Sequence, residues 1–239
     1  MAFSEEVAWV TGSSTGIGRA VAVALAGQGR RVVVHYNASE DEARGVVEQI
    51  EASGGEASLV GGDVSDAGEV RRMVGEIEDS FGRLDVLVNN AGSLIERRSL
   101  SEMTDDLWDR VIAVNLKSVY LVTRAVLPIM RRQGSGRIIN MTSIAARNGG
   151  GPGSIAYATA KGGVSTLTRA MAKELVSDNI LVNGVAPGVI TTPFHDRFTP
   201  PRHTREAEER HPDGTRGHSR GDRRGRRFPR LSGGGLPGR

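Results

Sequence analysis

A tyrosine and a lysine four residues apart have a spacing that suits proton transfer. Tyr157 and Lys161 fall in a stretch that reads as helix, so both side chains project from one face. A free phenol has a pKa of about 10, which must fall before it exchanges a proton near neutral pH. An ammonium group one helical turn away lowers a phenol pKa. Taken alone, the pair is more typical of a surface contact, in which the lysine stem lies along the protein and its head stays in water.

Two further polar residues precede this pair. Ser143 follows an apolar run, with Thr142 beside it, and its hydroxyl group is able to hold a substrate oxygen in place for Tyr157. Asn115 lies inside a long amphipathic stretch, where asparagine is a poor helix former, and its amide is able to hold a water in a proton relay. Taken singly, Ser143 is equally explained as a helix cap and Asn115 as a helix kink.

A glycine-rich turn lies far upstream of these residues. Residues 11–18 read Thr-Gly-Ser-Ser-Thr-Gly-Ile-Gly, follow the first apolar run and open a helical stretch. Glycines there let the backbone approach a pyrophosphate, whose charge lies at the helix N-terminus. The spacing is G-x-x-x-G-x-G rather than G-x-G-x-x-G, and a tight strand–helix turn is the alternative explanation. Its place between a first strand and a first helix favours dinucleotide binding.

The second apolar run indicates which dinucleotide is bound. It ends in His-Tyr-Asn at residues 35–37, without the acidic residue that NAD enzymes place there for the ribose 2′-hydroxyl, and Glu40 lies beyond the run. Without that acid, nothing repels a 2′-phosphate, and Ser14, Asn37 and Ser39 are able to donate hydrogen bonds to it. We therefore expect NADP, with NAD as the alternative.

Two more polar segments follow apolar runs. Asp63, with Val64 after it, is placed to accept a hydrogen bond from an adenine amino group, although it is equally explained as the cap of the next helix. Ser65 and Asp66 are equally able to form that cap. Residues 89–92 read Asn-Asn-Ala-Gly, an ordinary turn signal whose asparagines are able to tie neighbouring strand ends together and whose glycine leaves room for a cofactor.

The elements that must position these residues alternate along the chain. We expect strands at 7–10, 31–35, 57–60, 84–88, 137–141 and 180–185. We expect helices at 17–28, 40–53, 67–81, 107–130 and 157–176. Continuous apolar strands between helices predict an α/β fold, a doubly wound parallel sheet covered on both faces. We expect residues 1–200 to form this single domain, and residues 201–239 to be a separate tail.

The composition excludes several classes of protein. The chain has 239 residues, of which 38% are hydrophobic and 25% charged, enough to bury a core. The sequence has no cysteine, which excludes disulfides, thiolate metal sites and a cysteine nucleophile. No run of 18 apolar residues and no signal-peptide pattern is found, so we expect a cytoplasmic protein without a membrane span, and we expect no metal site.

The basic charge of the chain is concentrated in its tail. Residues 201–239 hold 11 arginines against five acidic residues, whereas residues 1–200 hold 20 basic against 23 acidic residues. The tail has few apolar residues, and we expect it to be disordered. Its arginines offer a second function, nucleic-acid binding through phosphates, but Phe228 is its only aromatic residue, which gives little support for base stacking.

Occurring in this order along one chain, the motifs resemble the short-chain dehydrogenase/reductase family. The resemblance covers about residues 5–200 and is strongest to the 3-oxoacyl-carrier-protein reductase and glucose dehydrogenase branches. It implies a Rossmann-like domain that transfers a hydride between a nicotinamide and a carbonyl or secondary alcohol of a small molecule, with a 3-oxoacyl or sugar-like substrate. It also implies a homodimer or homotetramer. An inactive nucleotide-binding relic of the family is the alternative.

The resemblance also implies a role for each site residue. Tyr157 is the general acid in reduction, Lys161 lowers its pKa and binds the nicotinamide ribose, Ser143 orients the carbonyl, and Asn115 positions a relay water. The predicted cofactor-binding residues are Gly12, Ser14, Thr15, Gly16, Ile17, Gly18, Tyr36, Asn37, Asp63, Val64, Asn89, Ala91, Gly92, Tyr157, Lys161, Pro187, Gly188, Ile190 and Thr192.

The resemblance ends near residue 200. Family members continue with a Gly-Arg-x-Gly-Thr-Pro-Glu-Glu-Ile-Ala segment, an apolar helix and a glycine-rich seventh strand, whereas this chain reads His-Ser-Arg-Gly-Asp-Arg-Arg at 218–224. A one-base shift explains this stretch. The family segment Thr-Pro-Glu-Glu-Ile-Ala-Gly can be encoded by ACT-CCC-GAG-GAG-ATC-GCC-GG. When a C precedes these codons and reading starts one base early, they encode His-Ser-Arg-Gly-Asp-Arg-Arg. A similar shift of Phe-Leu-Ala-Ser yields Phe-Pro-Arg-Leu, as at 228–231. We interpret the tail as a frameshifted family C-terminus, which leaves the sheet without its last strand and impairs stability and assembly.

This interpretation predicts the content of the gene. A single-base shift near the codons for residues 200–217 should restore an apolar helix and a glycine-rich strand. Sequencing the DNA over the codons for residues 190–239 tests the expectation. If no single-base shift restores those two elements, the frameshift hypothesis is wrong.

Overall fold

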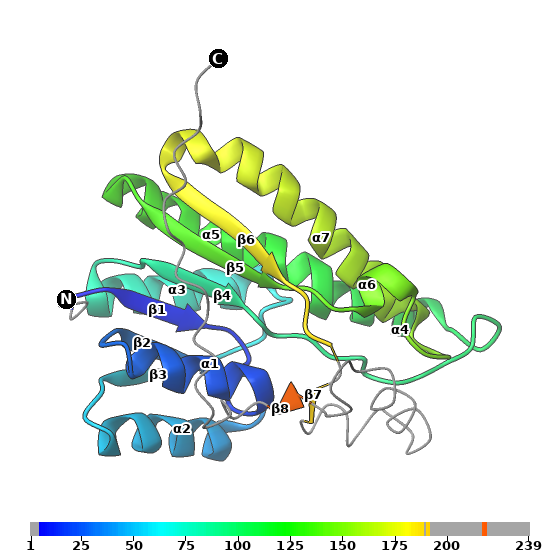
Figure 1. Ribbon diagram of the computed structural model, residues 1–239, viewed down its shortest axis with the longest axis horizontal. Coiled ribbons are helices and arrows are strands. Elements are labelled where there is room, and N and C mark those ends of the chain that lie inside the picture. Colours follow the sequence, from blue (N-terminus) through cyan, green and yellow to red (C-terminus); the bar gives the residue numbers. More distant parts are fainter. Residues whose placement is uncertain (1–4, 189, 192–216, 219–239) are drawn as a thin grey trace.

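The computed structural model describes residues 5–188, 190–191 and 217–218. Its main sheet has six parallel strands in the order β3-β2-β1-β4-β5-β6 (Figure 1). The order reverses direction at β1, so the chain winds outward first to one side and then to the other. This is the doubly wound parallel sheet that the alternation of apolar runs and helices predicts, and the expectation is confirmed.

The elements match the sequence pattern closely. The strands are β1 (Val7–Val10), β2 (Arg31–Tyr36), β3 (Ala57–Gly61), β4 (Val86–Asn89), β5 (Gly136–Met141), β6 (Ile180–Val185), β7 (Ile190–Thr191) and β8 (Gly217–His218). The α-helices are α1 (Gly16–Ala26), α2 (Glu40–Ala52), α3 (Ala67–Phe81), α4 (Asp105–Ile112), α5 (Ser118–Gln133), α6 (Ala145–Asn148) and α7 (Ile155–Leu175). A π-helix, η1 (Ala113–Lys117), joins α4 to α5, and a 3₁₀ turn, η2 (Val176–Asp178), follows α7.

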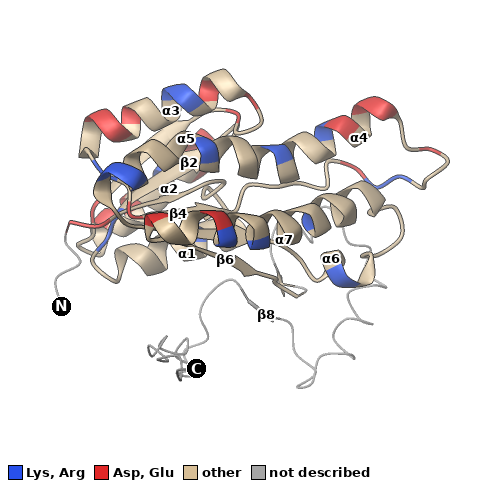
Figure 2. Ribbon diagram, turned by 90° about the horizontal axis from the view of Figure 1, so that it is seen from above, with Lys and Arg blue, Asp and Glu red and all other residues tan. Residues whose placement is uncertain are grey.

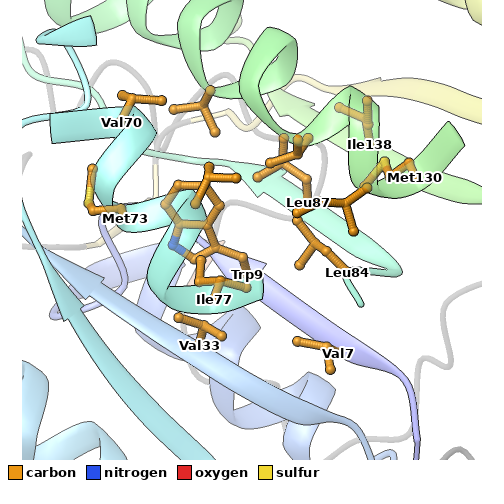
Figure 3. Packing of buried hydrophobic residues seen from close by; sticks show 14 of the residues in the cluster. Val7, Trp9, Val33, Val70, Met73, Ile77, Leu84, Leu87, Met130 and Ile138 are labelled. Carbon is orange, nitrogen blue, oxygen red and sulfur yellow. The ribbon is translucent and has the colours of Figure 1, made fainter. Parts of the chain in front are cut away.

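Helices cover the two faces of the sheet and form two separate cores. One core includes Val7, Trp9 and Val33 from the strands and is closed by α3, α5 and α7. Figure 3 shows the fully buried indole of Trp9 within this cluster, with Val33 and Ile77 close by. The second core packs α1 and α2 on the opposite face (Figure 1). Alternate residues of β1 and β2 point into one core or the other, which is why β1 and the Val32–Val34 segment of β2 are continuously apolar.

A network of buried polar side chains ties the second half of the sheet to its helices. The Asn89 side chain at the end of β4 donates to Thr123 Oγ1 on α5 at 3.1 Å and to Asn140 Oδ1 on β5 at 2.9 Å. Asn140 in turn donates to Thr168 Oγ1 on α7 at 3.0 Å. The network therefore fixes α7 against β5, because leaving any of these buried groups without its partner costs about 1–3 kcal/mol.

The helix expected at 107–130 is divided in three. Helix α4 ends at Ile112, the π-helix η1 inserts an extra residue in one turn, and α5 continues to Gln133. By length and composition alone, the 29-residue stretch Asp105–Gln133 is apolar enough to cross a membrane, with 44% of its most apolar window buried. A core helix of a soluble protein has the same properties, and Val122 and Val126 of α5 pack inside the first core.

The far edge of the sheet is apolar and exposed. Strand β6 is the last strand in the described order, and its Leu181 and Val185 are 51% and 47% exposed. Strands β7 and β8 pair with each other in a separate two-stranded parallel sheet. Apart from the two residues of β8, the tail at 201–239 lies outside the described residues, and so does its expected disorder. Figure 2 shows that acidic and basic residues are interspersed along the described helices rather than gathered by sign.

Candidate active site

A pocket of about 780 Å³ lies at the carboxyl ends of the parallel strands, where the strand order reverses. Small-molecule sites commonly have volumes of roughly 300–1,000 Å³ and lie at this position in doubly wound sheets. The glycine turn after β1, the ends of β2 to β5, and helix α7 all contribute side chains or backbone to its walls. The pocket thus joins the glycine turn to the Tyr157–Lys161 pair.

The glycine turn brings backbone unusually close to backbone. Gly12 has a φ of 61° in the left-handed region, and a Cβ placed on it would lie 2.9 Å from the Ala91 Cα. A Cβ on Gly18 would lie 2.2 Å from the Gly12 carbonyl oxygen. Any side chain at these two positions would push the start of α1 away from the turn. The bare turn at a helix N-terminus fits the pyrophosphate of a dinucleotide.

Thr11 and Asn90 hold this turn in place. The Thr11 hydroxyl oxygen accepts from the backbone N–H groups of Asn90 and Ala91, both at 3.0 Å. The Asn90 side-chain amide donates to the carbonyls of Thr11 and Gly12, both at 2.9 Å. The ends of β1 and β4 are therefore fastened together directly below the pocket, as the Asn-Asn-Ala-Gly segment suggested.

The nucleotide end of the pocket carries no unpaired acid from α2. Glu40 forms an ion pair with Arg44 and a hydrogen bond with the Tyr36 hydroxyl group, which raises the pKa of that phenol. Asn37, rather than Glu40, lines the pocket. Asp63 also lines it, and its Oδ1 accepts from the N–H and hydroxyl groups of Ser65 at 2.8 and 2.7 Å.

The alternative explanation of Asp63 as a helix cap does not hold. Asp66 caps α3 instead, accepting from the backbone N–H groups of Gly68 and Glu69 at 2.7 and 2.9 Å. Asp63 is thereby left at the pocket wall, beyond the end of β3.

At the other end of the pocket, Tyr157 meets Ser143. The Tyr157 ring rises from the first turn of α7 and is half-buried, and a side-chain hydrogen bond joins it to Ser143. The Ser143 oxygen also accepts the backbone N–H of Ala145 at 3.1 Å, which fixes its direction. Two hydroxyl groups are thus presented together to any carbonyl that enters the pocket.

Lys161 lies one helical turn further along α7 and is almost fully buried. Its ammonium group donates to the Met141 carbonyl at the end of β5, at 2.8 Å, and lies 5.8 Å from the centre of the Tyr157 ring. The amine and the ring therefore share one face of the helix, as their spacing predicted. Burial lowers the pKa of Lys161 to about 8, because the charged form is poorly solvated there.

Asn115 sits in the π-helix, where the extra residue turns its side chain inward. Its amide nitrogen donates to the carbonyls of Ser93 at 2.6 Å and Val111 at 2.9 Å. Its Oδ1 is buried, and within the described residues no donor reaches it. A Cβ on Gly92 would lie 2.6 Å from this oxygen and 3.2 Å from the Lys161 ammonium nitrogen. The oxygen and the amine therefore both lie close to the side of Gly92 on which a side chain would stand.

The charge balance around Tyr157 differs from the expectation. Burial raises the pKa of Tyr157, and the hydrogen bond with Ser143 opposes the rise only in part. The neighbouring amine was expected to lower this pKa. The reason for the difference is that burial of the phenol is the largest influence on its pKa, while the amine of Lys161 lies 5.8 Å from the centre of the ring and donates its hydrogen bond to Met141 instead.

Most of the predicted cofactor residues meet in the pocket. Those that line it are Gly12, Ser14, Thr15, Gly16, Ile17, Gly18, Tyr36, Asn37, Asp63, Val64, Ala91, Gly92, Tyr157, Lys161, Pro187, Gly188 and Ile190. Asn89 does not line it, because its amide is engaged in the network beneath the sheet. Thr192 lies outside the described residues.

Sequence reasoning missed two contributors, His35 and Asn90. His35 lines the pocket and directly follows three buried valines of β2, and a polar residue in that place was the signal available for it. The asparagine that braces the glycine turn is Asn90 rather than Asn89, and two adjacent asparagines cannot be told apart by pattern alone.

Comparison with known proteins decides the family. The family model described as short chain dehydrogenase matches residues 6–202. The chain belongs to the short-chain dehydrogenase family. This confirms the resemblance drawn from the motifs, and the match ends close to the point where the sequence departs from the family pattern.

Relatives support the assignment. A 3-oxoacyl-(acyl-carrier-protein) reductase of Synechocystis sp. is 48% identical over 191 residues, which cover 80% of this chain and 76% of that protein. The short-chain reductase NovJ of Streptomyces niveus is 45% identical, over 81% of this chain and 72% of that protein. The crystal structure of a dehydrogenase/reductase from Sinorhizobium meliloti 1021 is similar with a TM-score of 0.85 and 32% identity, covering 91% of this chain and 84% of that one.

Membership settles the broad activity. The protein is an NAD(P)-dependent oxidoreductase of the short-chain type, acting on a small-molecule substrate, and the expectation of an enzyme is confirmed. Its cofactor is a nicotinamide dinucleotide. The cradle formed by Gly12 and Gly18 fits the pyrophosphate of such a molecule.

The buried amine predicts a stability change at alkaline pH. The pKa of Lys161 is about 8 in the folded protein and about 10.4 in an unfolded chain, so between these values the unfolded state binds more protons. Stability should therefore rise with pH in this window, by up to about 3 kcal/mol. Lys161→Met should lack the rise, as urea unfolding from pH 7.5 to 10 would show.

Lys173→Met, which alters an exposed lysine on the same helix, serves as the control and should keep the wild-type slope. Equal slopes in the wild-type and Lys161→Met proteins would contradict a poorly solvated amine at this position.

Proposed function

We propose that this protein reduces the ketone of a 3-oxoacyl thioester with NADPH, in the cytoplasm. The observation that carries the proposal is the convergence of the Tyr157 and Ser143 hydroxyl groups on a pocket whose other end is the glycine turn. The substrate class follows from the curated 3-oxoacyl-(acyl-carrier-protein) reductases of Synechocystis sp. and Staphylococcus epidermidis, which are 48% and 46% identical to this chain.

Each of the four polar residues has a separate task in this proposal. Ser143 donates a hydrogen bond to the substrate carbonyl and holds it next to Tyr157, and Tyr157 donates the proton that completes the alcohol. The reduced nicotinamide, when bound, supplies the hydride. Lys161 and the Asn115 oxygen, which face the space beside Gly92, return a proton to Tyr157 through water.

The charges at the nucleotide end support NADPH rather than NADH. Asn37 occupies the wall where NAD enzymes hold an acidic residue, and the Glu40 carboxylate is balanced by Arg44. A 2′-phosphate therefore meets no unpaired negative charge from α2. NAD remains the alternative cofactor that the test below distinguishes.

We further propose that residues 1–200 form the catalytic domain and that residues 201–239 form a tail outside it. Every described residue that lines the pocket precedes residue 191. The exposed Leu181 and Val185 on β6 leave apolar surface that is costly in water, which supports reduced stability and impaired formation of a homodimer or homotetramer.

Replacing the proposed acid tests this function. Tyr157→Phe removes the proton donor but keeps the ring, so reduction should fall by about 10²–10⁴-fold while NADPH binding stays close to wild type. Tyr120→Phe, which alters an exposed tyrosine on α5, is the matched control and should be fully active.

The assay follows NADPH absorbance with 3-oxoacyl thioesters and with aldoses, and binding is followed by calorimetry. Full activity of Tyr157→Phe would remove Tyr157 from the reaction. Turnover of aldoses alone would replace the thioester with a sugar, and cofactor binding without any turnover would indicate an inactive relic.

Restoring an acid at the end of β2 tests the cofactor. Asn37→Asp places a carboxylate where a 2′-phosphate would lie, and it should raise the KM for NADPH about tenfold or more while improving use of NADH. Asn37→Ser, which is neutral, is the control. An unchanged preference in Asn37→Asp would place the 2′-phosphate elsewhere.

A further inference from the structure

A buried histidine connects the two loops that line the nucleotide end of the pocket. His35 lies in β2 between Val34 and Tyr36 and is 1% exposed. Its Nδ1 lies 2.9 Å from the backbone nitrogen of Gly12, and its Nε2 lies 3.0 Å from the carbonyl oxygen of Gly62. One imidazole ring therefore spans from the glycine turn after β1 to the loop after β3.

The two partners fix the protonation of the ring. A backbone N–H can only donate, so Nδ1 of His35 must carry a lone pair towards Gly12. A carbonyl oxygen can only accept, so Nε2 must carry the hydrogen towards Gly62. The geometry thus selects the neutral Nε2–H tautomer, because an imidazolium would point a second N–H at the Gly12 N–H.

The backbone around the ring strengthens the same connection. The Ser13 N–H donates to the His35 carbonyl at 2.9 Å, and the His35 N–H donates to the Ser13 hydroxyl oxygen at 2.8 Å. The Gly62 N–H donates to the Tyr36 carbonyl at 2.9 Å. The ring is the side-chain part of a continuous set of hydrogen bonds across three strand ends, and the pocket walls at Gly12 and Asp63 lie at its two sides.

We propose that His35 is a positioning residue for the cofactor, a neutral imidazole that holds the pyrophosphate turn at a fixed separation from the loop that carries Asp63. The turn has no other side chain that accepts its Gly12 N–H among the described contacts. Gly12, with its φ of 61°, lies where the turn approaches Ala91 so closely that no side chain fits.

Burial keeps the ring neutral over the working pH range, against the negative charge that faces it. Desolvation lowers the pKa of His35 to about 4, while the hydrogen bond with Gly62 and the negative charge of Asp63 oppose this shift. From α3, Arg72 and Glu69 lie against Gly62, and from β1 the Trp9 ring meets the imidazole edge-on at 6.2 Å between centroids. The contribution of His35 to cofactor binding should therefore not change around pH 6.5, where an ordinary histidine titrates, and should weaken only towards pH 4.

Two substitutions at His35 test whether the hydrogen bond with Gly12 matters for NADP binding. His35→Asn keeps an acceptor near the position of Nδ1 but cannot titrate, and it should bind NADP within a few-fold of wild type. His35→Leu leaves the partly buried Gly12 N–H without this acceptor, and the dissociation constant for NADP should rise about tenfold or more. Thermal unfolding of both variants checks that they are folded at the temperature of the assay.

The pH dependence of NADP affinity is compared between wild type and His35→Asn. Because both proteins bind the same nucleotide, the titration of the nucleotide itself cancels in the comparison. Between pH 8 and 4, the affinity of wild type for NADP should fall below that of His35→Asn only at the acid end. If His35→Leu is unfolded, this comparison and the spectra below still decide the proposal.

A measurement on the cofactor-free protein needs no activity at all. In long-range ¹H–¹⁵N NMR spectra, the buried imidazole should show an unprotonated Nδ1 and a protonated Nε2 at pH 7, and the Gly12 amide should exchange slowly. In Trp108→Phe protein, Trp9 fluorescence should stay constant from pH 8 to 5.5. An Nδ1–H tautomer, a transition near pH 6.5, or NADP affinity unchanged in His35→Leu would overturn the proposal.

Discussion

The hydrogen bond from the Lys161 ammonium group to the Met141 carbonyl is the contact on which the site depends. It joins α7 to the end of β5, at 2.8 Å, in a place where water does not solvate the charge. A buried ammonium without an acceptor would be far more costly than this one, so the contact fixes the rotation of α7 as well as its position. Because Tyr157 lies one turn earlier on the same helix, the phenol is aimed by the same contact. Burial lowers the pKa of the amine, because the charged form is poorly solvated there. Holding the charged amine in this place reduces the stability of the fold, and it gives the site a group that exchanges protons nearer to neutral pH.

The rest of the fold supports this contact through polar groups placed below the pocket. The Asn89–Asn140–Thr168 chain holds α7 and β5 together on the core side, while Thr11 and Asn90 fasten β1 to β4. Parallel strands deliver all of their carboxyl ends to one edge, so polar residues placed there converge although they are far apart in sequence. The apolar cores supply most of the stability, and these few hydrogen bonds fix the positions of the helices relative to the strands.

Much of this arrangement was predictable, and the misses have physical causes. Strands β1 and β6 and helix α3 have the predicted bounds, because a run of β-branched residues or a 3.6-residue period is a local property. The π-helix at Asn115 was not predictable as such, since its extra residue is stabilised by the Ser93 carbonyl and by packing that only the folded chain supplies. Asn89 was assigned to the cofactor because the sequence does not show which of two adjacent asparagine side chains points towards the pocket. The direction of the Tyr157 pKa was also missed, because spacing measures proximity but not burial.

Strand β6 links the exposed edge of the sheet to the pocket. In a parallel sheet both faces of each strand are normally covered, yet on β6 only Ile180 and Val182 are buried, and Leu181 and Val185 are exposed. Lys161 is held by β5, but the pocket also takes Pro187, Gly188 and Ile190 from the segment after β6. The backbone on both sides of Ser143 is paired with the end of β6, because the N–H groups of Thr142 and Ile144 donate to the carbonyls of Val185 and Pro187 at 2.8 and 3.0 Å. A change in the sequence beyond residue 200 therefore acts first on the exposed apolar surface of β6, through lost burial and an unpaired strand, and it reaches the chemistry through the pairing of this strand with the Ser143 segment.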